Sequence, residues 1–221
     1  MSSRLAALAD DLRARHFTDR PLVLANVWDA ASARAVAAAG HPVIATSSAA
    51  VAASLGVGDH EQMTADMAFA AVTRIVAAVD VSVTADLEAG YGLSADELVQ
   101  RLLDTGAVGC NLEDSDHHGP NLLRDPGRQA DYIAAVCDAA RQAGVGVVVN
   151  ARIDTYVSQV VPAEDRVAET LRRGHQYLNA GATCVYPIGV TDEQDITALV
   201  EQMGGPINIW LRPDSPTLAD L

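Results

Sequence analysis

The sequence predicts an α/β protein whose parallel strands form a (β/α)-barrel. Short apolar runs alternate with longer, alanine-rich amphipathic segments, which is the pattern of parallel strands covered by helices. Polar residues end several different runs, and barrel active sites collect side chains from the carboxyl ends of many strands. No GxGxxG motif follows the first run, which disfavours an open dinucleotide-binding sheet.

The expected elements follow one another in regular order. The apolar runs predict strands at 22–27, 42–46, 81–87, 107–113, 145–152, 182–187 and 206–211. The amphipathic segments predict helices at 3–15, 30–39, 61–79, 94–105, 126–143, 162–180 and 191–203. Helix ends are indicated by glycines that precede the next strand, namely Gly40, Gly106, Gly144 and Gly181. Helix starts are indicated by capping or first-turn residues, namely Ser94, Asp125 with Pro126, Pro162 and Thr191.

Composition limits the classes of function. The 221 residues, 49% of them hydrophobic, are enough for one core, so we expect a single domain over residues 1–221. The net charge of −14 disfavours nucleic acid as a partner. No apolar stretch is long enough for a membrane helix and no signal peptide is recognisable, so we expect a cytoplasmic protein without membrane attachment. Cys110 and Cys184 lie in apolar runs and are expected to be buried, reduced thiols.

Acidic residues at two neighbouring strand ends predict a metal site. Asp86 and Glu88 are two residues apart at the end of one strand, so their side chains point to the same side. Glu113 ends the next strand and should lie beside them. Converging carboxylates repel one another unless a cation neutralises them, and oxygen ligands suit Mg²⁺ or Mn²⁺. The alternative is that these are exposed loop carboxylates paired with nearby arginines.

Four stretches together resemble the isocitrate lyase/phosphoenolpyruvate mutase superfamily, in its 2-methylisocitrate lyase and phosphoenolpyruvate mutase-like branch. They are ANVWDAASARAVAAAG at 25–40, ATSSAAVAASLGVGD at 45–59, ADLEAGYG at 85–92 with GCNLEDS at 109–115, and NARID at 150–154. The resemblance implies a modified (β/α)₈ TIM-type barrel that binds a 2-oxo acid or enolate through Mg²⁺. It also implies the making or breaking of a C–C or P–C bond. Family members continue with an eighth strand and further helices, and neither is recognised here after the seventh run.

The resemblance also implies the roles of individual residues. The metal positions of the family match Asp59, Asp86, Glu88 and Glu113, of which Asp86 is the expected direct ligand. The substrate pocket matches Ser47, flanked by Thr46 and Ser48, together with Arg152. A guanidinium at this strand end suits bidentate binding of a carboxylate. Arg152 could instead, or at the same time, pair with Glu113 or Asp154. Tyr91 is either a substrate neighbour or a packing residue.

One loop departs from the family. The lyases carry a catalytic cysteine after the fourth strand, but residues 115–122 read SDHHGPNL and contain neither cysteine nor lysine. Asn121 matches an asparagine of the mutases, whereas Gly119 and Ile188 replace their lysine and histidine. His117 and His118 are the remaining candidates for proton transfer, because a histidine titrates near neutral pH. The alternative is that both histidines are solvated loop residues without a role.

We therefore expect a Mg²⁺-dependent enzyme, with Mn²⁺ as a substitute. It should act on a small 2-oxo or 2-hydroxy carboxylic acid through an enolate, as a C–C lyase. Two alternatives remain open at this point: a P–C bond enzyme acting on a phosphonate, of the phosphoenolpyruvate mutase or phosphonopyruvate hydrolase type, and a non-catalytic barrel that binds a 2-oxo acid. Because seven strands leave unpaired edges, we also expect a homo-oligomer, either a dimer or a tetramer.

Overall fold

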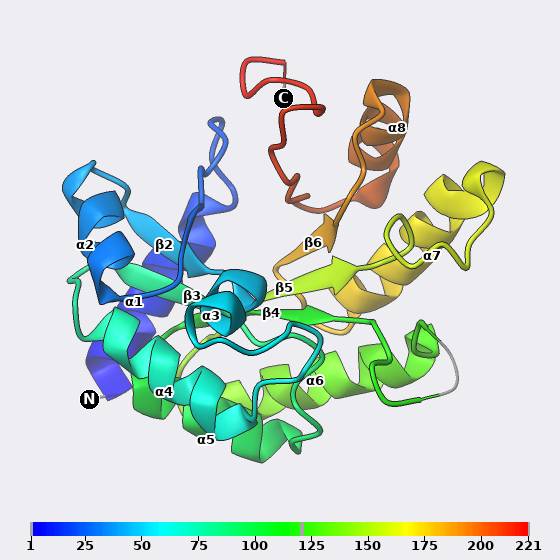
Figure 1. Ribbon diagram of the computed structural model, residues 1–221. Coiled ribbons are helices and arrows are strands. Elements are labelled where there is room, and N and C mark those ends of the chain that lie inside the picture. Colours follow the sequence, from blue (N-terminus) through cyan, green and yellow to red (C-terminus); the bar gives the residue numbers. More distant parts are fainter. Residues whose placement is uncertain (1, 120–121, 221) are drawn as a thin grey trace.

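The computed structural model describes residues 2–119 and 122–220, which form an α/β fold with one curled parallel sheet (Figure 1). The strands are β1 (Ala25–Val27), β2 (Val43–Thr46), β3 (Ser82–Asp86), β4 (Gly109–Glu113), β5 (Val148–Ile153) and β6 (Cys184–Pro187). The helices are α1 (Ser2–Arg15), α2 (Ala30–Ala38), α3 (Ser48–Ser54), α4 (Ala65–Val76), α5 (Ala95–Thr105), α6 (Pro126–Gln142), α7 (Arg166–Asn179) and α8 (Glu193–Met203), with a short 3₁₀ helix at Ala163–Asp165.

The sheet has the order β1-β2-β3-β4-β5-β6, and each strand pairs in parallel with its neighbour in sequence. This order places all carboxyl ends of the strands on one rim. The strands curl into half a barrel with the helices outside it (Figure 1). The predicted TIM-type α/β fold is therefore confirmed, and six of the seven expected strands lie where the apolar runs predicted them.

The prediction of a seventh strand at 206–211 was wrong. The segment makes one isolated parallel bridge, between Val185 and Ile207. Val185 N donates to Pro206 O at 3.1 Å, and Asn208 N donates to Val185 O at 2.8 Å. Proline has no N–H to donate, and no further strand within the described residues pairs with the outer side of this segment. An apolar run with one partner and a proline at its start therefore remains irregular.

Helix α1 covers the end of the half-barrel opposite the carboxyl rim. Leu12 is fully buried, and Ser82 Oγ donates to Leu8 O at 3.3 Å. Arg13 donates through Nη1 to Thr183 Oγ1 at 2.9 Å and through Nη2 to Val147 O at 3.2 Å. Thr183, Ser82 and Val147 all lie at or just before the starts of strands. Helix α1 thus covers the end of the half-barrel at which the strands begin.

Most predicted helices are confirmed, with four corrections. The helix expected from Pro162 begins as the 3₁₀ helix Ala163–Asp165, and α7 begins at Arg166. Ser94 caps α5 and Asp125 caps α6, as expected. Helix α8 is capped by Asp192 instead of Thr191, because its carboxylate accepts from two backbone N–H groups. The expected helix at 61–79 is α4, which begins only after the cap at Thr64, since Glu61 has a positive φ of 55° that an α-helix excludes. Helix α3 was not predicted, and Ser47 is its cap.

The two cysteines expected to be buried, Cys110 and Cys184, are buried free thiols. Burial raises the pKa of both thiols, so neither is a ready nucleophile. Within residues 2–119 and 122–220, every helix is too short or too polar to cross a bilayer.

Candidate active site

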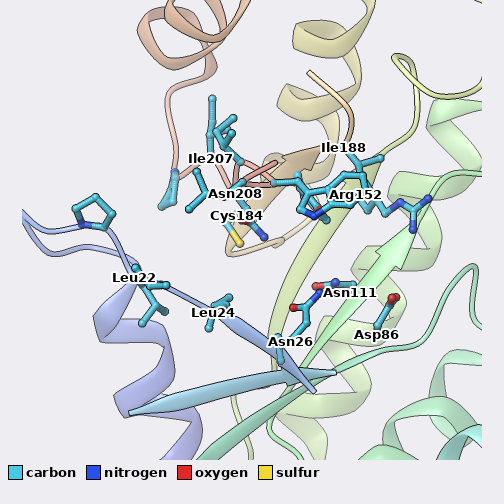
Figure 2. Close-up of a pocket in the computed structure, with 18 of the residues that line it drawn as sticks. Leu22, Leu24, Asn26, Asp86, Asn111, Arg152, Cys184, Ile188, Ile207 and Asn208 are labelled. Carbon is cyan, nitrogen blue, oxygen red and sulfur yellow. The ribbon is translucent and has the colours of Figure 1, made fainter. Parts of the chain in front are cut away.

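A cavity of about 770 Å³ reaches from the carboxyl rim of the sheet along the open side of the half-barrel to the end of α1, where Arg15 and His16 line it. Its polar wall contains Asn26 of β1, Asp86 of β3, Asn111 of β4 and Arg152 of β5 (Figure 2). These side chains come from four strands, and the parallel register brings the strand ends to one place. The cavity is therefore built as barrel active sites are built. Thr46, Ser47, Ser48 and Asp59, all expected at the site from the sequence, also line it.

The Asp86 carboxylate is held on one side and open on the other. Its Oδ2 accepts from Ser48 N at 2.9 Å and from Ser48 Oγ at 2.7 Å. The backbone N of Asp86 donates to Thr46 Oγ1 at 2.8 Å. Its Oδ1 accepts only a long contact of 3.4 Å from Glu88 N within the described residues. Thr46 and Ser48 thus orient Asp86, and Oδ1 remains available to a ligand in the cavity.

Glu88 is buried, and each of its carboxylate oxygens accepts one hydrogen bond. Tyr91 Oη donates to Oε1 at 2.8 Å, and Glu61 N donates to Oε2 at 2.5 Å. Tyr91 N in turn donates to Glu61 Oε1 at 2.6 Å. Tyr91 therefore supports Glu88 and is absent from the cavity lining. Glu61, which the sequence reading did not identify, ties the two loops together. In the sequence, the one indication of this role was that Glu61 lies two residues after the predicted metal residue Asp59.

The backbone around these carboxylates is strained. His60, Glu61, Glu88 and Tyr91 all have positive φ, between 49° and 64°, a region that costs a non-glycine residue of order 1–3 kcal/mol. Gly90 has a φ of 96°, and a Cβ there would lie 2.7 Å from Tyr132 Oη, so only glycine fits this turn. Such strain concentrates at functional sites, where the surroundings hold the backbone in place.

Arg152 lies between two carboxylates. Its Nη1 is 2.6 Å from Glu113 Oε2, and its Nε and Nη2 donate to the two oxygens of Asp154 at 2.7 and 2.9 Å. Ser115 Oγ donates to Asp154 Oδ2 at 2.5 Å. Both expected ion pairs are thus present, and the guanidinium still reaches the cavity wall. The pairs fix its orientation toward a ligand there.

The loop that follows β4 folds back onto this group. His117 Nε2 makes a very short contact with Glu113 Oε1. His118 is 72% exposed, and its Nε2 lies 3.0 Å from Glu61 Oε2. His117 therefore contacts the acidic cluster from its buried side, and His118 contacts it from the solvent side. Asn121, the third expected loop residue, lies outside the described residues.

Burial and charge shift the protonation of this group. Burial raises the pKa of Glu88 and of Glu113, although hydrogen bonds and the charge of Arg152 oppose the rise. The hydrogen bond to Glu113 raises the pKa of His117. Burial lowers the pKa of Arg152, but the attraction of Glu113 and Asp154 outweighs it, so the pKa ends above its usual value. The acidic groups thus favour a bound proton or another cation at this place.

The side chains fit a divalent cation. One ligand atom each from Glu88, Glu113 and His117 lie within 4.8 Å of one another. Asp59 Oδ1 is buried and has no hydrogen-bond partner in the described part of the chain. A buried carboxylate oxygen without a donor is costly, and a cation would compensate it. Asp59 and Asp86 lie near enough to Glu88 for their charges to raise its pKa, and both line the cavity.

The half of the cavity away from Asp86 and Arg152 is apolar, and the sequence did not predict this. Leu22 and Leu24 lie before β1, and Ile188 and Ile207 lie near β6 (Figure 2). Trp210 and Leu218 line the same region. These residues come from opposite ends of the chain. Only the curl of the sheet brings them together.

A second buried group supports the loop from below. Asp114 is fully buried. Its Oδ2 accepts from Arg173 Nη1 at 2.9 Å and from Tyr177 Oη at 2.8 Å, and its Oδ1 accepts from Asp154 N at 2.9 Å. Arg173 also donates to Arg124 O at 3.0 Å, where the loop ends. This pair links α7 to both ends of the loop and to the residue that holds Arg152.

Comparisons with known proteins agree with this geometry. The family model described as phosphoenolpyruvate phosphomutase matches residues 12–221. An uncharacterised Mycobacterium tuberculosis protein is 32% identical over 208 residues, which are 93% of this chain and 75% of that protein. Oxaloacetate decarboxylase 2 of Pseudomonas putida is 28% identical over 206 residues, 89% of this chain and 65% of that protein.

Among solved structures, a Burkholderia cenocepacia protein proposed to be a phosphonomutase superposes with a TM-score of 0.89. It is 39% identical, and the match covers 96% of this chain and 87% of that one. The fold and the rim that carries the site are therefore shared with this group of proteins.

Proposed function

The chain belongs to the phosphoenolpyruvate phosphomutase family, and from this we propose a Mg²⁺-dependent enzyme that acts on a small 2-oxo or 2-hydroxy carboxylic acid through an enolate, most simply as a C–C lyase. The observation that carries the proposal is the pairing, on one cavity wall, of an open Asp86 Oδ1 with the oriented guanidinium of Arg152. An enolate of a 2-oxo acid has two anionic groups, an enolate oxygen and a carboxylate. The wall offers a cation position for the first and an arginine for the second.

Each residue then has a defined task. Asp86 would hold the cation directly, with Asp59 beside it, and Glu88 and Glu113 would act on its water ligands. When bound, Mg²⁺ would supply Lewis-acid stabilisation of the enolate oxygen. Arg152, with Ser47 at the start of α3, would hold the substrate carboxylate. Thr46, Ser48 and Tyr91 would keep the carboxylates oriented.

The cleavage requires two proton transfers. A hydroxyl on one fragment loses a proton as the C–C bond breaks, and the electron pair of that bond passes to the enolate, which then takes a proton on carbon. His117 and His118 are the titratable loop groups available for these transfers. Asn121 stays a proposed loop residue of the site. The P. putida relative supports the proposed substrate class, since its name states a decarboxylase of oxaloacetate, which is a 2-oxo acid.

P–C chemistry is the second candidate function, favoured by the 39% identity to the Burkholderia cenocepacia protein. A substrate panel with Mg²⁺ separates the two. We expect turnover of a 2-oxo or 2-hydroxy acid, and no efficient cleavage of isocitrate or 2-methylisocitrate, because the loop has no cysteine acid. Turnover of phosphonopyruvate alone would favour the second candidate. Rapid cleavage of 2-methylisocitrate would contradict the inference that this cleavage needs the cysteine that the loop lacks.

We expect the double variant His117→Ala/His118→Ala to lose turnover while it still binds Mg²⁺ and oxalate, a stable mimic of the enolate. General acid–base groups contribute roughly 10²–10⁴-fold to a rate, so kcat should fall by about that factor. Steady-state kinetics and calorimetry measure the two properties separately. Turnover at the unmodified rate would show that both histidines are solvated loop residues.

We further propose that the protein is a homo-oligomer, a dimer or a tetramer, and that it acts on its small-molecule substrate in the cytoplasm. Large apolar side chains are exposed around the apolar half of the cavity, namely Val23, Val200, Trp210, Leu211 and Leu218. Exposed apolar patches of this kind mark contact surfaces. Light scattering should give at least twice the monomer mass. Trp210→Glu should lower that mass, and a wild-type monomer would contradict the proposal.

A further inference from the structure

We propose that Tyr177 of α7 is a positioning residue for the active site: its hydroxyl fixes the Asp114 carboxylate, and through it the direction in which Arg152 faces the cavity. Tyr177 itself does not line the cavity. This role of Tyr177 rests on the proposed function, in which Arg152 holds the substrate carboxylate. It adds to that function a residue of the helical layer, outside the cavity, on which carboxylate binding depends.

A chain of hydrogen bonds joins Tyr177 to the guanidinium. Tyr177 Oη donates to Asp114 Oδ2 at 2.8 Å, and Asp114 Oδ1 accepts from Asp154 N at 2.9 Å. The Asp154 carboxylate in turn accepts from Arg152 Nε and Nη2 at 2.7 and 2.9 Å. Because Asp114 uses one carboxylate oxygen for each side of this chain, a rotation of the carboxylate would disturb both contacts together.

Pairing within the sheet does not fix Asp154. Strand β5 ends at Ile153, and its register with β6 ends at the same residue, so Asp154 lies just beyond the paired strands. Its backbone N donates to the side chain of Asp114 instead. The position of the Asp154 carboxylate, and with it the orientation of the Arg152 guanidinium, therefore depends on how the Asp114 side chain is held.

The Tyr177 hydroxyl is suited to hold Asp114 in one orientation. Tyr177 and Asp114 are both fully buried. Tyr177 Oη accepts from Arg173 Nη1 at 3.3 Å while it donates to Asp114, so the hydroxyl proton has one defined direction. Burial raises the pKa of Tyr177, and the hydroxyl therefore keeps the proton that it donates. Arg173 supplies the charge that compensates Asp114, whereas Tyr177 supplies a directional bond.

Calorimetric titration of oxalate in the presence of Mg²⁺ tests this role. Tyr177→Phe removes one oxygen atom and keeps the buried ring and the ion pair between Asp114 and Arg173. Loss of a group that orients a metal ligand typically weakens binding roughly 10–100-fold, and we expect the low end of that range for oxalate, while Mg²⁺ still raises the Tm. In the Arg152→Ala protein, adding Tyr177→Phe should change oxalate affinity by less than about twofold, because both residues act on one path.

Tyr156→Phe is the matched control. The Tyr156 hydroxyl also donates to a carboxylate, Asp195 Oδ2, at 3.0 Å. This bond joins the loop after β5 to α8 and lies outside the path from Tyr177 to Arg152. We therefore expect wild-type oxalate affinity from Tyr156→Phe, and circular dichroism checks that both single variants fold.

Three results would overturn the role of Tyr177: wild-type oxalate affinity in Tyr177→Phe, an equal loss in Tyr156→Phe, or an undiminished further loss when Tyr177→Phe is added to Arg152→Ala. Disappearance of the Mg²⁺-dependent rise in Tm in Tyr177→Phe would also overturn it, because the damage would then extend beyond the guanidinium. Failure of the wild-type protein to bind oxalate with Mg²⁺ would instead contradict the proposed function itself.

Discussion

Asp86→Ala is expected to abolish the stabilisation of the protein by Mg²⁺. A ligand that binds only the native state at 100 times its Kd adds about 2.7 kcal/mol to the free energy of unfolding. For a chain of this size this corresponds to a rise in Tm of roughly 5–10 °C. Because Asp86 Oδ1 is the open carboxylate oxygen on the cavity wall, its removal should reduce the Mg²⁺-dependent rise to near zero.

The controls keep this result specific. Asp86→Asn preserves an acceptor for Ser48, so it should fold like the wild type and still respond weakly to Mg²⁺. Asp104→Asn removes an equal charge from the exposed face of α5 and should retain the full rise in Tm. Thermal unfolding followed by circular dichroism measures all three. A full Mg²⁺ response in Asp86→Ala would place the cation elsewhere.

Arg173→Ala is expected to cost about 3–5 kcal/mol of stability, the range observed when one partner of a buried ion pair is removed. Arg173 is 6% exposed and Asp114 is fully buried. Without the guanidinium, the Asp114 carboxylate would keep, among the described residues, only the hydrogen bonds from Tyr177 and Asp154 N. Denaturant unfolding monitored by circular dichroism gives the change.

The neighbouring residue provides a matched control. Arg172 is half-exposed and pairs with Glu169 at 2.7 Å on the surface, so Arg172→Ala should cost less than about 1 kcal/mol. Removing both charges with Asp114→Asn/Arg173→Met should recover part of the loss, since the double variant leaves no uncompensated charge. Equal effects of Arg172→Ala and Arg173→Ala would contradict this account.

The sequence predicted the features that depend on local pattern. Six strands were visible as apolar runs because both faces of a parallel sheet are buried. Asp86, Glu113 and Arg152 were recognisable because each lies at a strand end. The prediction of the seventh strand failed because an apolar run does not show whether a second strand is present to pair with it. The bridge at Ile207 shows how little pairing this run obtains.

Other features depend on contacts distant in sequence. Asp114 and Arg173 are 59 residues apart, and no local pattern joins them. One signal was present: Arg173 lies at helical spacing among the buried positions Thr170, Gly174 and Tyr177 of α7, where an unpaired arginine would be costly. Glu61 and Tyr91 meet through strained turns that residue type alone did not predict.

The central claim is that the rim holds a cation and an enolate-like dianion together, through Asp86 and Arg152. Calorimetric titration of oxalate, with and without Mg²⁺, tests it most directly. We expect tight oxalate binding with Mg²⁺, and at least about tenfold weaker binding without Mg²⁺ or in Arg152→Ala, because each loses a charged contact to the ligand. Oxalate affinity that is independent of both Mg²⁺ and Arg152, or the absence of oxalate binding under all conditions, would contradict the claim.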